Sequence, residues 1–289
     1  GVQYSGKWNL QTQGQAVGAN TWPGIATSEL YSWGLNTSGQ LGNGSTANTS
    51  SPVQVGGITW AKVNAGNVSS AAIKTDGTLW TWGNAAQGQL GDGTTVGKSS
   101  PIQVGALTTW SEVAGGVNNV LALKTDGTLW SWGRNSEGQL GLNDQVNRSS
   151  PVQIGSYTTW SAIASGGYHA LAVKTDGTLW GFGYNFHGPL GQGNNTNYSS
   201  PVQVGALTTW LKVACGKYHT LATKTDGTLW AWGYNLRGQI GDGTTDVRYS
   251  PVQVGALTTW YTCAGGEVCS ASIKTDGTLW TWGGNQWGA

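Results

Sequence analysis

Short segments rich in Val, Ile, Thr and Trp recur along the chain with a period of 50 residues. Each period contains four of them, of the forms W-x-x-V-A, A-I-K-T, T-L-W-T-W-G and P-V-Q-V, and each is bounded by Gly or Asp-Gly. Apolar, β-branched runs with such boundaries predict β-strands. We therefore predict an all-β chain in which every repeat folds as one four-stranded unit.

The string KTDGTLW marks the period most clearly, because it begins at Lys74, Lys124, Lys174, Lys224 and Lys274. Its Asp-Gly pair predicts a tight hairpin between the second and third strands, since Gly accepts a positive φ and Asp tolerates it. A WG or FG pair stands at 33, 82, 132, 182, 232 and 282 and so gives six units, of which the outer two are incomplete. Units of this size bury their apolar faces by stacking on their neighbours, as the blades of a β-propeller do.

Two aromatic residues in each third strand are expected to supply the core. Trp80 and Trp82 are two residues apart and therefore point to the same face of the sheet, and the same holds for Trp130 and Trp132. A large aromatic side chain removes more than about 150 Å² from water when it is buried. We interpret these tryptophans as packing residues between blades, in preference to a surface for stacking sugars or bases.

The same strings resemble the RCC1-like repeats, whose hallmarks are a WG pair, an N-x-x-GQLG loop and a GGxHxLAxK segment. They occur here as SWGRNSEGQLG and as GGYHALAVK, among other copies, and the likeness covers residues 31–289. The resemblance, to members of a bacterial or phage type, implies a β-propeller. Propellers of this family commonly have seven blades. We expect six from the six WG units, with seven as the alternative.

The first 30 residues fit the repeat poorly and form a separate N-terminal segment in this interpretation. The string GVQYSGKW is similar to PVQVGALTTW, and the chain stops at WTWGGNQWGA before such a strand. We therefore expect an N-terminal strand to close the ring, which would remove exposed edges. The string QYSGKWNLQTQGQA, followed by Trp-Pro, also resembles virion structural proteins of marine bacteriophages. That likeness implies an adaptor that contacts a capsid, tail or filament subunit.

Composition excludes several classes of partner. Charged residues make up 9% of the chain and the formal net charge is +1, so no broad field is available to attract nucleic acid or an anionic membrane. No apolar run reaches the roughly 18 residues that a membrane span needs. The three cysteines form no CxxC pair. Cys263 and Cys269 flank a Gly-Gly loop and could form a hairpin disulfide if their Cα atoms lie within about 7 Å.

The chain carries no recognised catalytic signature. It has no G-x-S-x-G elbow, no H-E-x-x-H motif and no P-loop, and its acidic residues are mainly turn aspartates. His169 and His219 stand at equivalent positions of adjacent repeats, but two imidazoles without a carboxylate make an incomplete metal site. We therefore expect neither an enzyme nor a cofactor or metal.

Variation between the repeats points to one face of the propeller. KTDGT and GALTTW hardly change, whereas the Gly-Gly loop after the first strand and the long loop after the third strand differ from copy to copy. In a four-stranded meander these two loops emerge on the same face. Tyr and Arg, which are enriched at interface hot spots, gather in the fourth and fifth copies. The candidate partner-binding residues are Tyr168, His169, Tyr184, Phe186, His187, Tyr198, Tyr218, His219, Tyr234, Arg237, Arg248 and Tyr249. The alternative is that they only pack on neighbouring loops.

These observations favour a non-enzymatic structural or interaction protein on a virion or extracellular surface, as a decoration or fibre component. The alternative is a module that recognises a host receptor or surface glycan through the variable loops. A regulator of a small GTPase, as in eukaryotic RCC1 proteins, is disfavoured, because the chain has neither acidic residues aimed at a GTPase nor basic tails for chromatin. The expected partners are a protein subunit or a glycan, with self-association into a homo-oligomer as a further option.

Overall fold

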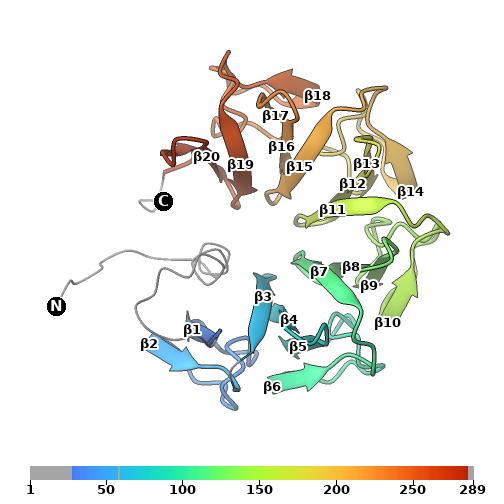
Figure 1. The fold of residues 1–289 in the computed structure, drawn as a ribbon, viewed down its shortest axis with the longest axis vertical. Coiled ribbons are helices and arrows are strands. Elements are labelled where there is room, and N and C mark those ends of the chain that lie inside the picture. Colours follow the sequence, from blue (N-terminus) through green and yellow to red (C-terminus); the bar gives the residue numbers. More distant parts are fainter. Residues whose placement is uncertain (1–27, 58, 286–289) are drawn as a thin grey trace.

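The computed structural model describes residues 28–57 and 59–285, and every regular element in these ranges is a β-strand. The strands form antiparallel meanders arranged around a common axis (Figure 1). Successive meanders follow one another in chain order around this axis. The first strand of each meander lies nearest the centre, and the fourth lies at the periphery (Figure 1).

Five of these sheets are blades. Blade 1 contains β3 (Trp60–Ala65), β4 (Ser69–Lys74), β5 (Leu79–Gly83) and β6 (Lys98–Gln103). Blade 2 contains β7 (Trp110–Gly115), β8 (Asn119–Lys124), β9 (Leu129–Gly133) and β10 (Arg148–Gln153). Blade 3 contains β11 (Trp160–Ser165), β12 (His169–Lys174), β13 (Leu179–Gly183) and β14 (Tyr198–Gln203). Blade 4 contains β15 (Trp210–Cys215), β16 (His219–Lys224), β17 (Leu229–Gly233) and β18 (Arg248–Gln253). Blade 5 contains β19 (Trp260–Gly265), β20 (Cys269–Lys274) and β21 (Leu279–Gly283).

The prediction of six blades, with seven as the alternative, is wrong, because the described residues form five. The first WG unit, at Trp33, lies in β1 (Tyr31–Gly34), which pairs with β2 (Thr49–Gln54) in a sheet of only two strands. A WG pair therefore marks a third strand and does not guarantee a complete blade around it. The predicted closing strand and adaptor, residues 1–30, fall almost entirely outside the described residues, which begin at Ser28.

The strand and turn predictions are confirmed in each blade. In blade 1, Trp60 pairs with Lys74 at the start of the first hairpin, and Ile73 pairs with Leu79 across the second. Gly77 has a φ of +78°, and Asp76 Oδ1 accepts hydrogen bonds from the backbone N–H (3.0 Å) and hydroxyl (2.6 Å) of Thr78. The Asp-Gly pair thus closes the turn as the sequence predicted.

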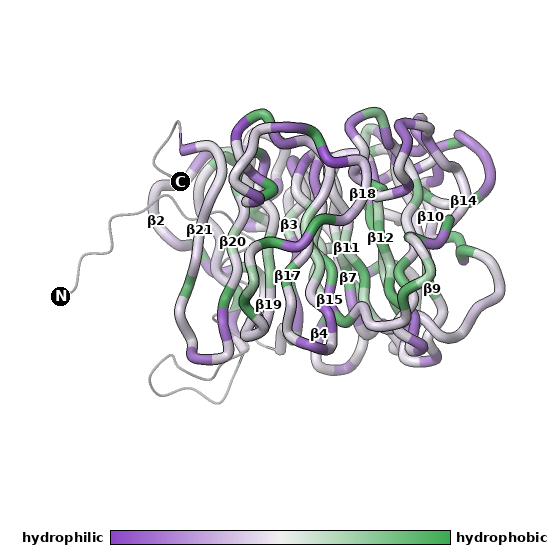
Figure 2. The backbone as a smooth tube through the Cα atoms, turned by 90° about the horizontal axis from the view of Figure 1, so that it is seen from above, coloured by the Kyte–Doolittle hydropathy of each residue, from purple (hydrophilic) through white to green (hydrophobic). Residues whose placement is uncertain are grey.

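The hydrophobic core lies between blades. Leu79 and Val104 of blade 1 belong to the same buried cluster as Trp110 and Trp132 of blade 2, and comparable clusters join the later blades. Figure 2 shows the hydrophobic segments concentrated in the strands, with polar loops at the two faces. The interpretation of these tryptophans as packing residues is confirmed, since the side chain of Trp132 is fully buried.

The long loop that follows a third strand contacts the next blade, and at four of the five blades it forms a hydrogen bond that we call the Trp latch. In this Trp latch, the indole N–H of Trp132 donates to the carbonyl oxygen of Gln89 at 3.0 Å. Equivalent bonds join Trp82 to Gln40 (2.9 Å), Trp232 to Pro189 (2.8 Å) and Trp282 to Gln239 (2.9 Å). Gly91, beside the Gln89 carbonyl, has a φ of +71°, and a Cβ there would lie 2.7 Å from Trp132 Nε1. Glycine is therefore required both for the backbone and for the indole.

All three cysteines are free thiols, so no disulfide joins Cys263 to Cys269. Burial raises the pKa of the Cys263 thiol to about 12 and that of Cys215 further, so neither forms a reactive thiolate at neutral pH. In the described ranges, no helix is long and apolar enough to cross a membrane.

The Trp latch predicts an asymmetric response to tryptophan truncation. Trp132→Phe removes the indole N–H and leaves the buried carbonyl of Gln89 without its donor, so we expect a loss of about 2–4 kcal/mol in the free energy of unfolding. Trp130→Phe is the matched control, because Trp130 is only half-buried and its indole N–H bonds the hydroxyl of Thr128. Urea denaturation should show a clearly larger loss for Trp132→Phe, and equal losses would contradict the role of the latch.

Candidate partner-binding face

The two kinds of variable loop emerge together, as the meander predicted. The backbone N–H of Tyr184, in the long loop of blade 3, donates to the carbonyl oxygen of Tyr168, in the inner loop, at 2.9 Å. We call this side the variable face; it is formed by the inner loops 66–68, 116–118, 166–168, 216–218 and 266–268 and by the long loops after the third strands. On the opposite side, the turn face, the N–H of Trp110 donates to the carbonyl oxygen of Gly77 at 3.1 Å.

An aromatic cluster covers the variable face of blades 3 and 4. Its members come from two inner loops and two long loops and are Tyr168, Tyr184, Phe186, His187, Tyr218 and Tyr234. Tyr168 stacks on Tyr218 with centroids 6.0 Å apart, and His187 lies 4.9 Å from Tyr234. Tyr184 contacts Tyr218 at 5.6 Å. The structure therefore brings together six of the twelve candidates as one continuous surface.

The cluster keeps groups available for a partner. Phe186 is 58% exposed, and Leu236 at the equivalent position of blade 4 is 57% exposed. Tyr168, Tyr184, Tyr218 and Tyr234 are half-buried, and within the described part of the chain none of their hydroxyls makes a hydrogen bond. Such a mixture of apolar rings and free hydroxyls is typical of interface hot spots.

Charged side chains border the cluster. The guanidinium of Arg134 lies 5.0 Å from the ring centroid of Tyr168, and the ammonium of Lys217 lies 5.7 Å from that of Tyr218. Lys217 also forms an ion pair with Glu267 on the next blade at 2.5 Å. Burial, followed by the nearby Tyr218 and Glu137, raises the pKa of Tyr184 to about 12, so this ring stays a neutral phenol.

The axial pocket adjoins the cluster at the centre of the variable face. It has a volume of about 290 Å³ and is lined mainly by the inner loops of all five blades, including Tyr168, Lys217 and Glu267. The loops nest closely: a Cβ on Gly66 would lie 2.6 Å from the carbonyl oxygen of Gly116, and the next glycines around the axis are placed alike. Only glycine permits this approach.

Four other candidates lie outside the cluster. Tyr198 accepts a hydrogen bond from the side-chain amide of Asn194 at 3.0 Å, and Arg248 bonds Asp242 at 2.6 Å, so both stabilise their own long loops. Tyr249 is 40% exposed on β18, and Arg237 is exposed in the long loop of blade 4.

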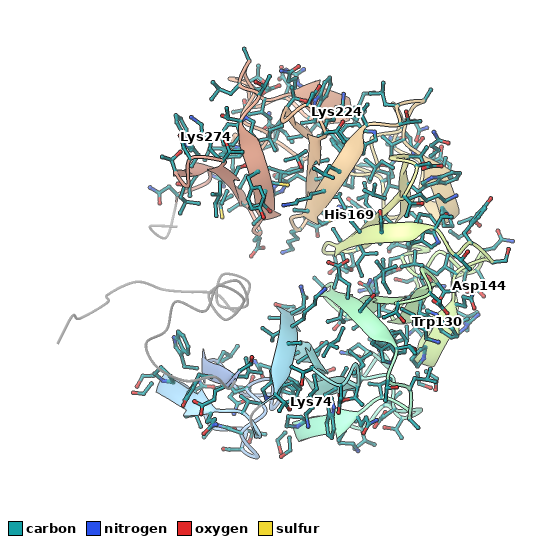
Figure 3. The ribbon with its side chains drawn as sticks, viewed as in Figure 1. Lys74, Trp130, Asp144, His169, Lys224 and Lys274 are labelled. Atoms are coloured by element: carbon teal, nitrogen blue, oxygen red, sulfur yellow. The ribbon has the colours of Figure 1, made fainter. Side chains whose placement is uncertain are left out.

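His169 and His219 are fully buried and do not reach the variable face; Figure 3 places His169 near the centre of the ring. His169 Nε2 lies 3.1 Å from the hydroxyl of Thr220 on blade 4, and that hydroxyl donates to the carbonyl oxygen of Pro189 at 2.8 Å. The Thr220 oxygen must therefore accept a hydrogen bond from Nε2–H, which assigns the Nε2–H tautomer of His169. His219 bonds Ser270 of blade 5 in the same way.

The histidines therefore join neighbouring blades. Burial, with a smaller contribution from His219, lowers the pKa of His169 to about 3, and burial lowers that of His219 to about 4. In the part of the chain that the structure describes, no three His, Cys, Asp or Glu side chains are grouped so that they could hold a metal ion.

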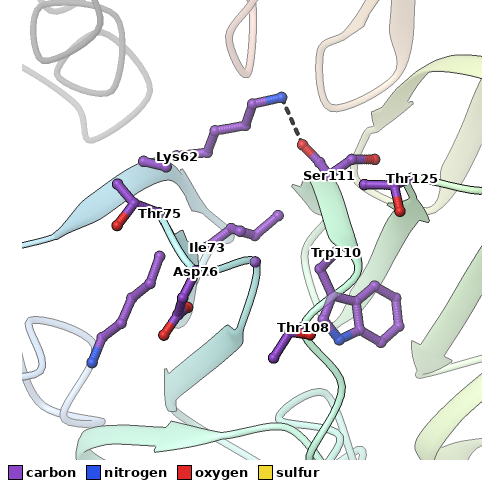
Figure 4. A pocket seen from close by; sticks show the side chains of 11 residues that line it. Lys62, Ile73, Thr75, Asp76, Thr108, Trp110, Ser111 and Thr125 are labelled. Carbon is purple, nitrogen blue, oxygen red and sulfur yellow. Dashed lines mark hydrogen bonds between the residues drawn. The ribbon is translucent and has the colours of Figure 1, made fainter.

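The turn face is occupied by internal contacts. The repeated lysines, three of them labelled in Figure 3, lie over tryptophan rings of their own blades; Lys224 Nζ, for example, is 3.5 Å from the centroid of Trp230. A depression of about 340 Å³ between blades 1 and 2 contains Lys62, whose ammonium donates to the carbonyl oxygen of Ser111 at 2.6 Å (Figure 4). The depression is also lined by the carboxylate of Asp76, which is hydrogen-bonded to Thr78 in its own turn. This depression is a seam between blades.

Two contacts of this face were not predicted from the sequence. They are the stacking of Arg134 on Tyr168 and the ion pair between Lys217 and Glu267. One signal was present for the ion pair, since Lys217 and Glu267 occupy equivalent positions of adjacent repeats and carry opposite charges. The others at this position are Asn67, Val117 and Gly167.

Comparison with family models matches residues 15–289 to the RCC1-like domain. Among curated proteins, no sequence matches the chain. Human WBSCR16 is similar in structure, with a TM-score of 0.74, 24% identity, and coverage of 85% of this chain and 67% of that one. Yeast RCC1 (Prp20) bound to Kap60 has a TM-score of 0.78 and 20% identity, with coverage of 89% of this chain and 66% of that one. Prp20p from Saccharomyces cerevisiae has a TM-score of 0.78 and 22% identity, with coverage of 89% of this chain and 68% of that one. The chain spans about two thirds of these proteins, and at these identities they show the fold alone.

The buried histidines predict a loss of stability in acid. Their folded pKa values lie below the unfolded value of about 6.5, so the unfolded chain binds protons that the folded chain does not, and stability falls as pH drops below about 6.5. At pH 5 we expect a loss of about 2 kcal/mol for each histidine relative to pH 7.5. Urea denaturation at both pH values measures it.

The chain supplies its own substitution for this test, because Asn119 stands at the equivalent position of blade 2. The double variant His169→Asn and His219→Asn should lose most of the difference between pH 7.5 and pH 5. His187→Asn should retain most of it, because His187 is only half-buried and burial lowers its pKa less. A double variant with the full pH dependence would show that other groups cause it.

Proposed function

We propose that this chain, which belongs to the RCC1-like domain family, is a non-enzymatic interaction module that binds a protein partner through the variable face of blades 3 and 4. The aromatic cluster carries this proposal. The repeat itself does not require it, since the positions equivalent to Phe186 are occupied by Ala86 in blade 1 and Ser136 in blade 2, and those blades keep the same strands.

The physical chemistry of the cluster supports a protein partner. Phe186 and Leu236 expose apolar surface at equivalent positions of adjacent blades, and the half-buried tyrosines add rigid rings with free hydroxyls. Rings that are already packed on one another lose little side-chain entropy when a partner covers them. Arg134 and the Lys217–Glu267 pair form a polar rim around this apolar centre.

The similar structures support the proposal through their shared fold. One shows yeast RCC1 (Prp20) bound to Kap60, and another concerns the binding of Prp20p to Gsp1p and histones. These partners are those of the yeast protein. For the present chain they indicate that a propeller of this kind can serve as a platform for other proteins.

A second candidate function is recognition of a receptor glycan by the same cluster. The free hydroxyls on the half-buried rings of Tyr184 and Tyr218 favour it, because aromatic rings with polar groups at their edges suit the mixed character of a sugar. Saturable binding of the chain to a glycan array, lost in Tyr184→Ala, would favour the glycan over a protein partner.

The setting that we propose is a virion or extracellular surface. Low charge and the resemblance of the N-terminal segment to phage virion proteins support it. Quantitative mass spectrometry of purified native particles, culture medium and cell lysate tests this setting. Enrichment in particles or medium is expected, and retention of the chain in the lysate alone would rule it out.

The binding face can be mapped by photo-crosslinking in the native source. A benzophenone side chain at position 186 should give adducts with one defined protein, whereas the same group at Tyr157 on the turn face should give few. In the double variant Tyr184→Ala and Tyr218→Ala, loss of hot-spot contacts of about 2 kcal/mol or more should reduce the adducts at least tenfold. Specific adducts from position 157 alone would place the partner on the other face.

A further inference from the structure

The backbone of the axial pocket offers hydrogen-bond acceptors. The N–H groups of its central glycines are used, because Gly66, Gly116, Gly166, Gly216 and Gly266 each donate to the carbonyl oxygen three residues later in the chain. In contrast, no N–H or O–H group among the described residues donates to the carbonyl oxygens of Gly66, Gly116, Gly166 or Gly216. The carbonyl oxygens of Gly116, Gly166 and Gly216 lie close to the glycine of the preceding inner loop, whose C–H groups are at most weak donors.

Several of the donors that line the pocket are already engaged. Lys217 Nζ bonds Glu267 Oε1 at 2.5 Å, and the Lys217 N–H bonds the carbonyl oxygen of Gly266 at 3.2 Å. The Gly167 N–H bonds the carbonyl oxygen of Lys217 at 3.1 Å. The N–H groups of the central glycines and the ammonium of Lys217 are thus engaged, whereas the carbonyl oxygens of Gly66, Gly116, Gly166 and Gly216 are free to accept hydrogen bonds.

Glu267 adds a negative charge, and only one of its two carboxylate oxygens is paired with a cation. Its side chain is 67% exposed at the rim of the pocket, and Lys217 contacts one of its two carboxylate oxygens. Tyr168 contributes an aromatic ring to the lining of the pocket, and this ring already has the guanidinium of Arg134 beside it at 5.0 Å. Carbonyl oxygens, a carboxylate and a ring face are three groups that attract cations.

We propose that the axial pocket binds an organic cation, the guanidinium or ammonium group of an arginine or lysine side chain that the protein partner inserts at the axis. This assignment rests on the proposed function and specifies the segment that is recognised. Guanidinium and ammonium groups carry only donors, which matches a site of free acceptors. A volume of about 290 Å³ accommodates one such side chain. The residues beside it in the partner lie over the aromatic cluster.

An anionic ligand fits the same site poorly. It would meet the glycine carbonyl oxygens that line the pocket, and it would compete with Glu267 for the ammonium of Lys217. An uncharged apolar side chain would leave the carbonyl oxygens desolvated without a donor, which is unfavourable. Charge and hydrogen bonding therefore both select a cation.

Titration followed by the backbone amide signals of the full chain tests the assignment. The probes are N-acetyl-arginine methylamide, N-acetyl-lysine methylamide and the neutral N-acetyl-norleucine methylamide. The two cationic probes should shift the signals of Gly116, Gly166 and Gly216 in a saturable way, and norleucine should not. The stronger of the two cations identifies the preferred side chain.

Two variants with the same change of charge complete the test. Glu267→Gln should weaken binding of the cationic probes at least tenfold, whereas Asp246→Asn, an exposed residue of the long loop of blade 4, should leave it unchanged. Equal shifts with all three probes, no shift with any of them, or undiminished binding by Glu267→Gln would overturn the assignment. If the probes fail while cross-linking at position 186 persists, only the pocket assignment falls; if cross-linking fails while the probes bind as described, the pocket assignment stands.

Discussion

The arrangement of the blades depends on a contact between the loop of one blade and the indole of the next. The second tryptophan of a third strand donates its N–H to a carbonyl oxygen of the preceding long loop, and a glycine in that loop gives the ring its space. Because a single four-stranded unit cannot bury its own apolar face, this contact fixes neighbouring units and completes the core between them. Blade 3 is the exception, since Phe182 fills the same position without an N–H.

The latch also explains why function can concentrate on one face. The long loop is fixed at its base, where Asn185 accepts a bond from the N–H of Leu190 and donates to the carbonyl oxygen of Asn194, both at 3.0 Å. Next to Asn185, side chains such as Tyr184 and Phe186 can change without disturbing the strands. The inner loops are built in the same way. Closely packed glycines fix their backbone, while the next position varies between the repeats, from Asn67 in blade 1 to Glu267 in blade 5. The aromatic cluster and the axial pocket are therefore displayed by a rigid frame.

Much of the fold could be predicted because the same strand and turn pattern recurs in every repeat. The strands, the Asp-Gly turns, the burial of the tryptophans and the separation of the faces all follow from a period that is visible in one chain. The number of blades could not be read from the WG pairs, since Trp33 belongs to a sheet of two strands. The burial of single residues was also not predicted. His169 follows Tyr168 directly, yet it is fully buried, because it begins β12, whose residues are all buried, whereas Tyr168 belongs to the inner loop and is half-buried. The pairing of Lys217 with Glu267 depends on contact between blades, which a period alone does not give.

The proposed partner contacts the variable face of blades 3 and 4. A cryo-electron microscopy structure of the chain in its native assembly would locate the partner directly. Partner density is expected over Phe186, Tyr184 and Leu236, extending towards the axis beside Glu267. Partner density confined to the turn face, over Leu107 and Leu207, with the aromatic cluster left open to solvent, would contradict the proposed contact.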